Sequence, residues 1–128
     1  MSGLRTRRED LADEALVVVR GGAMEMRSLR LDAVRAHRRF GEFAISVLAG
    51  PDEPAIDELA RTTLRRHVVL TLVTAGAIRS AGLELRPTFR RPHYSVVLPN
   101  LDDGLHRLMT CQTVERDNPH YVPPEAQP

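Results

Sequence analysis

The sequence alternates short apolar runs with segments whose apolar residues recur at helical spacing, and this alternation most constrains the fold. Residues 15–19 (Ala-Leu-Val-Val-Val) form a continuous, mainly β-branched run, which is typical of a strand covered on both faces. Residues 26–40 repeat apolar side chains at helical spacing, with Ser28 as a candidate N-cap and Gly41 at the expected C-terminal position. Residues 43–48 predict a second buried strand.

The same alternation continues along the rest of the chain. Residues 52–67 predict an amphipathic helix with acidic residues early and Arg65, Arg66 and His67 at its end, an order that complements the helix dipole. The further predicted elements are a strand at 68–73, a turn or short helical connector at 76–82, strands at 83–89 and 94–98, and a helix at 100–109 that Asn100 caps.

The fold class follows from the order of these elements, β-α-β-α-β-β-β-α. It predicts an α/β fold in a single domain over residues 1–121, followed by a disordered tail at 122–128. We expect a mixed sheet that is mainly parallel, with the strands at 83–89 and 94–98 paired antiparallel. Pro87 cannot donate to a ladder, so the strand at 83–89 is expected at a sheet edge. A ferredoxin-like α+β sandwich is the alternative arrangement.

Charge and cysteine content exclude several classes of protein. The 128 residues carry 18 basic side chains, all of them arginine, against 17 acidic ones, so the formal net charge of +1 excludes a strongly basic nucleic-acid coat. Cys111 is the single cysteine, which excludes an intramolecular disulfide and a multi-cysteine zinc site. No apolar run approaches the roughly 20 residues that span a bilayer. We expect a cytoplasmic protein that binds no metal, no cofactor and no membrane.

Two segments are candidate ligand sites. Arg20, Gly21 and Gly22 follow the first strand, where glycine amides can approach an anion, although a flexible turn explains them equally. Residues 86–94 interleave basic and aromatic side chains, which suits phosphate contact with base stacking. The candidates there are Arg86, Arg90 and Arg91 for phosphate, Phe89 and Tyr94 for stacking, and His93 as a proton carrier. The alternative is a solvated edge strand whose charges prevent aggregation.

Arginines also gather at the ends of the two long predicted helices. Arg35, Arg38 and Arg39 close the first helix, and Arg65 and Arg66 close the second. Cations in the last turn of a helix complement its dipole and need no further role.

Two resemblances add to this reading. Residues 17–22, 39–41 and 86–94 resemble blocks of short actinobacterial proteins, a resemblance that implies no activity. Short stand-alone proteins of this kind are often halves of toxin–antitoxin pairs. An arginine ending an early strand and a serine in the next strand are also similar to ADP-ribosyltransferases of the Arg-Ser-Glu type. That resemblance implies that Arg20 holds NAD phosphates, Ser46 orients the nicotinamide side and Glu84 is the late acidic residue.

Three functions therefore remain open, and the sequence does not decide whether the protein is an enzyme. The leading hypothesis is a small module that binds an anionic partner, nucleic acid or nucleotide, through its basic edge strand. The second is a protein-interaction partner, one half of a two-gene pair or a homo-oligomer, that pairs through the same edge. The third is an NAD-using enzyme with Ser46, Glu84 and His93 as its catalytic residues.

Overall fold

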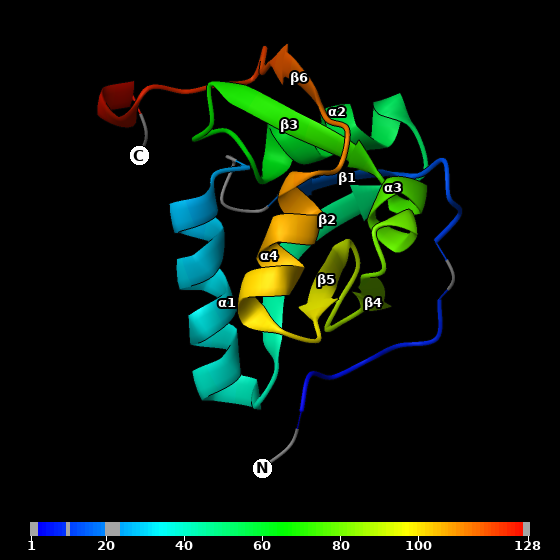
Figure 1. Cartoon of the computed structure of the whole chain (residues 1–128). Coiled ribbons are helices and arrows are strands. Elements are labelled where there is room, and N and C mark those ends of the chain that lie inside the picture. The colour runs from blue at the N-terminus through cyan, green and yellow to red at the C-terminus, as the bar shows by residue number, and fades with distance from the viewer. Residues whose placement is uncertain (1–2, 10, 20–23, 127–128) are drawn as a thin grey trace.

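The computed structural model describes residues 3–9, 11–19 and 24–126, and it arranges six strands in one sheet of order β4-β5-β2-β1-β3-β6 (Figure 1). In chain order the elements are β1 (Leu16–Val19), α1 (Met26–Phe40), β2 (Phe43–Gly50), α2 (Glu53–Thr62), β3 (Val69–Thr74), α3 (Ala75–Ser80), β4 (Glu84–Pro87), β5 (His93–Leu98), α4 (Leu101–Met109), β6 (Val114–Asp117) and the 3₁₀ turn η1 (Pro124–Ala126).

The predicted α/β class is confirmed, but the expectation of a mainly parallel sheet is wrong. Each ladder that joins the six strands is antiparallel. The reason lies in the direction of the first helix. Gly41, at a φ of 82°, turns the chain tightly from α1 into β2, as a parallel crossover would also require, but α1 runs in the sense of β1 and does not return along it. A strand, helix and strand in this arrangement give antiparallel neighbours instead of a crossover.

One predicted connector is helical, and one strand was not predicted. The segment at 76–82, predicted as a turn or short helical connector, overlaps α3, whose first turn is capped by the Thr74 hydroxyl. The strand β6 lies in a segment for which no strand was predicted. Its sequence, Val-Glu-Arg-Asp, carries three charges in four residues, and three of its four residues are exposed. A solvated edge strand of this composition has no apolar period to detect.

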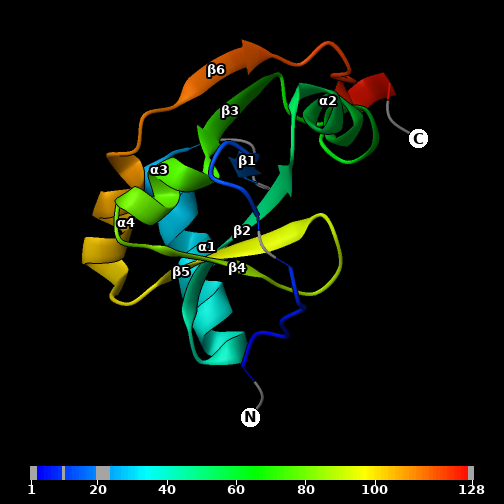
Figure 2. The same ribbon diagram turned by 90° about the vertical axis from the view of Figure 1, so that its right-hand side faces the viewer.

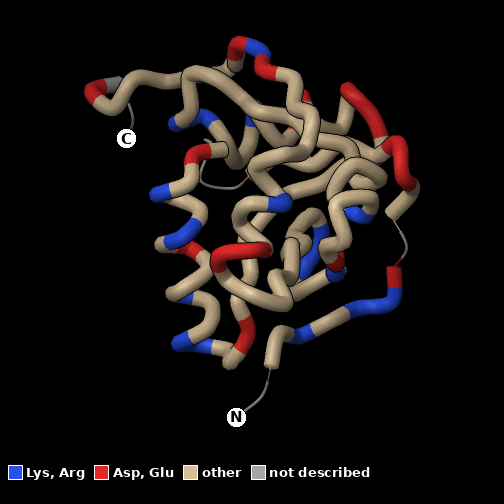
Figure 3. The backbone as a smooth tube through the Cα atoms, in the orientation of Figure 1, with Lys and Arg blue, Asp and Glu red and all other residues tan. Residues whose placement is uncertain are grey.

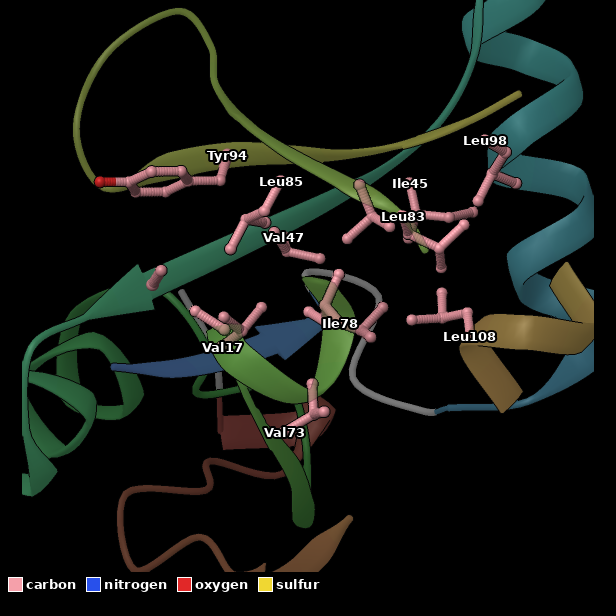
Figure 4. Close-up of a cluster of buried hydrophobic side chains, with 14 of the residues drawn as sticks. Val17, Ile45, Val47, Val73, Ile78, Leu83, Leu85, Tyr94, Leu98 and Leu108 are labelled. Atoms are coloured by element: carbon pink, nitrogen blue, oxygen red, sulfur yellow. The ribbon is translucent and has the colours of Figure 1, made fainter. Parts of the chain in front are cut away.

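One face of the sheet, here the front face, carries the main core. Figure 2 shows α3 and α4 on this side of the sheet and α2 on the other. Figure 4 shows side chains from the strands and helices meeting in this core, including Val17, Ile45 and Val73 from three strands and Ile78 and Leu108 from α3 and α4. These residues alternate along the strands, so their neighbours in sequence point to the opposite, back face.

The back face is covered in two separate places. Ile56, Leu59 and Leu64 from α2 and the turn after it pack on Leu48 of β2 and on strands β1 and β3. The N-terminal segment places Leu4 on the far part of β2 and β5. No helix of the described chain covers the sheet between these two clusters, where β2 and β5 present Ser46 and His93.

The N-terminal segment also follows the outer side of β4, which is the edge strand that Pro87 predicts. Thr6 forms an antiparallel bridge with Thr88, and the amide of Arg7 donates to the carbonyl of Pro87 at 3.1 Å. The amide of Phe89 donates to the carbonyl of Arg5 at 3.0 Å. These bonds fix the beginning of the loop between β4 and β5, which borders the candidate site.

Candidate functional site

A pocket of about 620 Å³ opens on the back face between the two clusters that cover it. Strands β2 and β5 supply its floor, the end of α1 and the end of α2 supply two sides, and the β4–β5 loop supplies a third. The lining residues are Arg39, Phe40, Ser46, Leu48, Thr63, Phe89, Arg90, Arg91, Pro92 and His93. The volume is in the range of small-molecule sites, which is roughly 300–1,000 Å³.

Phe89 presents an aromatic ring at this pocket in a strained backbone conformation. Its φ of 56° lies in the left-handed region, which is costly for a large side chain. The ring lies 5.5 Å from Phe40 and 5.1 Å from His93, measured between centroids, yet Phe89 as a whole remains 39% exposed. Strain of this kind persists where the surroundings enforce it, and it gathers at functional sites.

His93 is held from below by a chain of buried hydroxyl groups. Its Nδ1 lies 2.8 Å from Thr88 Oγ1, which in turn lies 2.9 Å from Ser95 Oγ. Thr88 is fully buried, and His93 and Ser95 are nearly so. Because two contacts, the Thr88 hydroxyl and the Phe89 ring, restrain the imidazole, it keeps one orientation at the pocket floor.

Ser46 of β2 lies on the pocket floor with His93. Among the described residues, the last pair that joins β1 to β2 at this end is Val19 with Val47. The Ser46 amide donates to Asp32 Oδ2 of α1 at 2.8 Å. This bond joins α1 to β2 near the pocket, to which the C-terminal end of α1 contributes Arg39 and Phe40.

Three arginines line the pocket, and carboxylates of the described chain neutralise them only in part. Arg91 lies 3.1 Å from Glu9 and is 76% exposed at its side chain. Arg39 and Arg90 form no ion pair with a described residue. Among the described residues, the arginines outside any ion pair are Arg5, Arg8, Arg27, Arg35, Arg38, Arg39, Arg65, Arg66 and Arg90.

Arg86, predicted as a phosphate ligand, is instead engaged inside the molecule. Its guanidinium donates to both oxygens of Glu84 at 2.8 and 2.9 Å and to Glu42 at 2.8 Å. The hydrogen bond with Glu84, and then that with Glu42, raises the pKa of Arg86 above its ordinary value. The same bond from Arg86 lowers the pKa of Glu84. Neither residue lines the pocket, so the structure does not bring Glu84 to Ser46 and His93.

Tyr94, predicted as a stacking ring, is buried in the front-face core, where Figure 4 shows its hydroxyl directed away from the apolar cluster. The Arg7 guanidinium covers the ring at 4.6 Å from its centroid. Burial, followed by a hydrogen bond with Glu9, raises the pKa of the Tyr94 phenol. Arg7 also donates to the carbonyls of Thr88 and His93, both at 2.7 Å. Tyr94 therefore does not line this pocket, and Arg7 covers one face of its ring.

The structure thus divides the predicted site residues into three groups. It brings together Ser46, Phe89, Arg90, Arg91 and His93 at one pocket. It places Glu84, Arg86 and Tyr94 elsewhere. The third group, Arg20, Gly21 and Gly22, lies outside the described residues.

Sequence reasoning missed the two sides of the pocket that helices supply. Arg39 and Phe40 come from the last turn of α1, and Thr63 is the C-terminal cap of α2. A basic residue at a helix end is explained by the dipole, so nothing in the sequence pointed Arg39 toward residue 90. The signal that was present is Ser46 within an otherwise apolar strand and His93 at the start of the strand β5.

Other kinds of site find no support in the described part of the chain. There, no group of three or more His, Cys, Asp or Glu side chains is placed to hold a metal ion. No helix within the described ranges is both long and apolar enough to cross a membrane. Comparisons with protein-family models, with curated proteins and with solved structures found no match.

Proposed function

We propose that the protein binds a nucleotide, free or as one unit of a nucleic acid, in the back-face pocket. The base stacks on Phe89, and Arg39, Arg90 and Arg91 contact phosphate. The observation that carries this proposal is the convergence of an exposed ring and three arginines, from two distant segments of the chain, on one concavity.

The chemistry of the lining distinguishes this ligand from other anions. A simple anion needs the arginines alone, whereas an exposed ring held in a strained conformation contributes nothing to its binding. A base has an aromatic face that stacks on phenylalanine, and such stacking contributes about 1–3 kcal/mol per base. Guanidinium groups bind phosphate oxygens through paired N–H donors. A nucleotide uses both features at once.

The pocket also contains one imidazole, that of His93, and one floor hydroxyl, that of Ser46. His93 is the candidate proton carrier if a bound nucleotide is also a substrate. The ADP-ribosyltransferase resemblance receives less support, because Glu84 is paired with Arg86 away from the pocket.

Calorimetric titration at low salt tests the proposal. We expect UTP and ATP to bind, tripolyphosphate to bind more weakly, and uridine to bind weakly or below detection. Phe89→Ala should weaken the two nucleotides while leaving tripolyphosphate unchanged, because only the base loses a contact. Arg90→Gln should weaken all three anions.

Arg8→Gln is the matched control, since Arg8 is exposed, forms no ion pair with a described residue and does not line the pocket. The proposal fails if neither nucleotide binds at low salt. It also fails if Phe89→Ala and Arg90→Gln bind as the wild type and the Arg8→Gln variant do.

A further inference from the structure

We infer that the occupant is a single-stranded nucleic acid several nucleotides long, with one base in the pocket and its neighbouring phosphates on arginines beyond the pocket. This inference rests on the proposed nucleotide site and extends it. The arginines that no described carboxylate neutralises are its starting point.

The nine arginines outside any described ion pair include five that line the pocket or lie a few residues from its lining in sequence. Arg39 and Arg90 line the pocket, and Arg35 lies four residues before Arg39 on α1. Residues four apart on a helix are neighbours, about 6 Å between Cβ atoms. Arg65 and Arg66 lie two and three residues after Thr63, which lines the opposite side. All five are exposed.

Figure 3 shows the charge pattern on the backbone, with several arginines following one another along α1. Other arginines are paired with acids, as Arg30 with Asp102 and Arg107 with Asp103. The remaining arginines without an ion pair among the described residues are exposed and do not line the pocket: Arg5, Arg8, Arg27 and Arg38. A chain with almost equal numbers of acidic and basic residues can pair nearly all of them. Unpaired cations around one pocket repel one another unless an anion joins them.

The number of these cations exceeds what one nucleotide requires. The pocket arginines already surround the phosphate of a single unit, so Arg35, Arg65 and Arg66 remain for further phosphates. Successive phosphates of a polynucleotide supply them. The strand must be unpaired at the pocket, because a base can stack on Phe89 only when it has left its own partner and neighbour.

Fluorescence anisotropy with a labelled 12-nucleotide strand tests this inference, with UMP as competitor. Each contact with a phosphate of a single strand contributes about 0.7 to the slope of the logarithm of the binding constant against the logarithm of the salt concentration. At 0.1 M salt, each such contact therefore makes binding about fivefold tighter. Three contacts beyond the pocket therefore make the 12-mer about 100-fold tighter than UMP. We expect the corresponding duplex to bind more weakly than the single strand. RNA and DNA versions of the strand show whether the 2′-hydroxyl contributes.

The variant that isolates the outer contacts is Arg35→Gln with Arg66→Gln. It should weaken the 12-mer about 25-fold at 0.1 M salt, reduce the salt slope by about 1.4 and leave UMP binding unchanged. The control is Arg8→Gln with Arg27→Gln, which removes the same net charge from exposed arginines away from the pocket. This control should weaken the 12-mer only slightly.

Three results overturn the inference: a 12-mer that binds no tighter than UMP, a duplex that binds as well as the single strand, or a double variant no weaker than the control. UMP binding that still depends on Phe89 and Arg90 would leave the nucleotide site standing in each case. If UMP binding is absent, or is the same in the Phe89 and Arg90 variants as in the wild type, the proposed function itself fails.

Discussion

The backbone strain at Phe89 makes an unusual prediction about protein stability. Replacing Phe89 with alanine or with glycine removes the same ring and the same contacts with Phe40 and His93. The two variants differ only in backbone preference. Alanine at a φ of 56° retains the left-handed cost of about 1–2 kcal/mol, which glycine does not have. Glycine loses about 0.5–1 kcal/mol more conformational entropy on folding.

The free energy of unfolding of Phe89→Gly should therefore exceed that of Phe89→Ala by about 0.5–1 kcal/mol. Urea denaturation of both variants measures this difference. The matched pair is Arg90→Gly and Arg90→Ala, since Arg90 is next in sequence, exposed and not in the left-handed region. There the alanine variant should be the more stable by about the same amount. If Phe89→Ala proves as stable as Phe89→Gly, or more stable, the strain described here does not exist in solution.

Three further perturbations follow from contacts on the two faces of the sheet. Thr88→Val removes a fully buried hydroxyl together with its hydrogen bonds to His93 and Ser95, so the free energy of unfolding should fall by about 2–3 kcal/mol, whereas Thr88→Ser should have a much smaller effect. Gly104→Ala places a Cβ 2.7 Å from Leu98 Cβ. This change should therefore lower the free energy of unfolding by about 1–2 kcal/mol, despite the better helix propensity of alanine. A variant more stable than the wild type would contradict this crowding. The hydrogen bond from Arg86 lowers the pKa of Glu84 in the folded state below its ordinary value of 4.5. The Glu84 carboxylate therefore stabilises the fold when the pH is above 4.5, and this contribution is lost as the pH falls through the pKa of the folded state. The wild type should therefore lose more stability than Glu84→Gln between about pH 5 and about pH 3, and parallel losses in urea titrations would show that this ion pair does not act on folding.

Much of the secondary structure can be predicted from the sequence, because burial of one face of a helix or strand makes its apolar residues recur at a regular spacing. The apolar runs at 15–19, 43–48 and 68–73 each coincide with most of a strand, and the helix capped by Asn100 begins where its cap predicts. What the pattern cannot supply is direction. Whether a helix returns along the preceding strand or continues past its end depends on the connection between that strand and the helix and on tertiary packing, so the antiparallel sheet was not predictable from alternation.

The candidate site was predictable in part and for a similar reason. The loop around residue 90 is contiguous, so its arginines and Phe89 stand out together in the sequence. Arg86 and Tyr94 are also a basic and an aromatic residue of this segment, but their side chains lie away from the pocket. Arg86 is paired with Glu42 and Glu84, and Tyr94 is buried under Arg7. The contacts of Arg86 with Glu42 and of Tyr94 with Arg7 join residues more than 40 positions apart, which local composition does not reveal.

The incomplete cover of the back face has a consequence for how the protein responds to an occupant. Helix α2 shields β1 and β3, the N-terminal segment shields the far part of β2 and β5, and the strip between them faces the pocket. A ligand bound in the pocket would cover the part of the back face that lies between α2 and the N-terminal segment. Occupancy should therefore slow amide exchange on strands that are already hydrogen-bonded, and the melting temperature should rise with ligand concentration. A bound ligand would in this way complete the layer that the described residues leave open over β2 and β5.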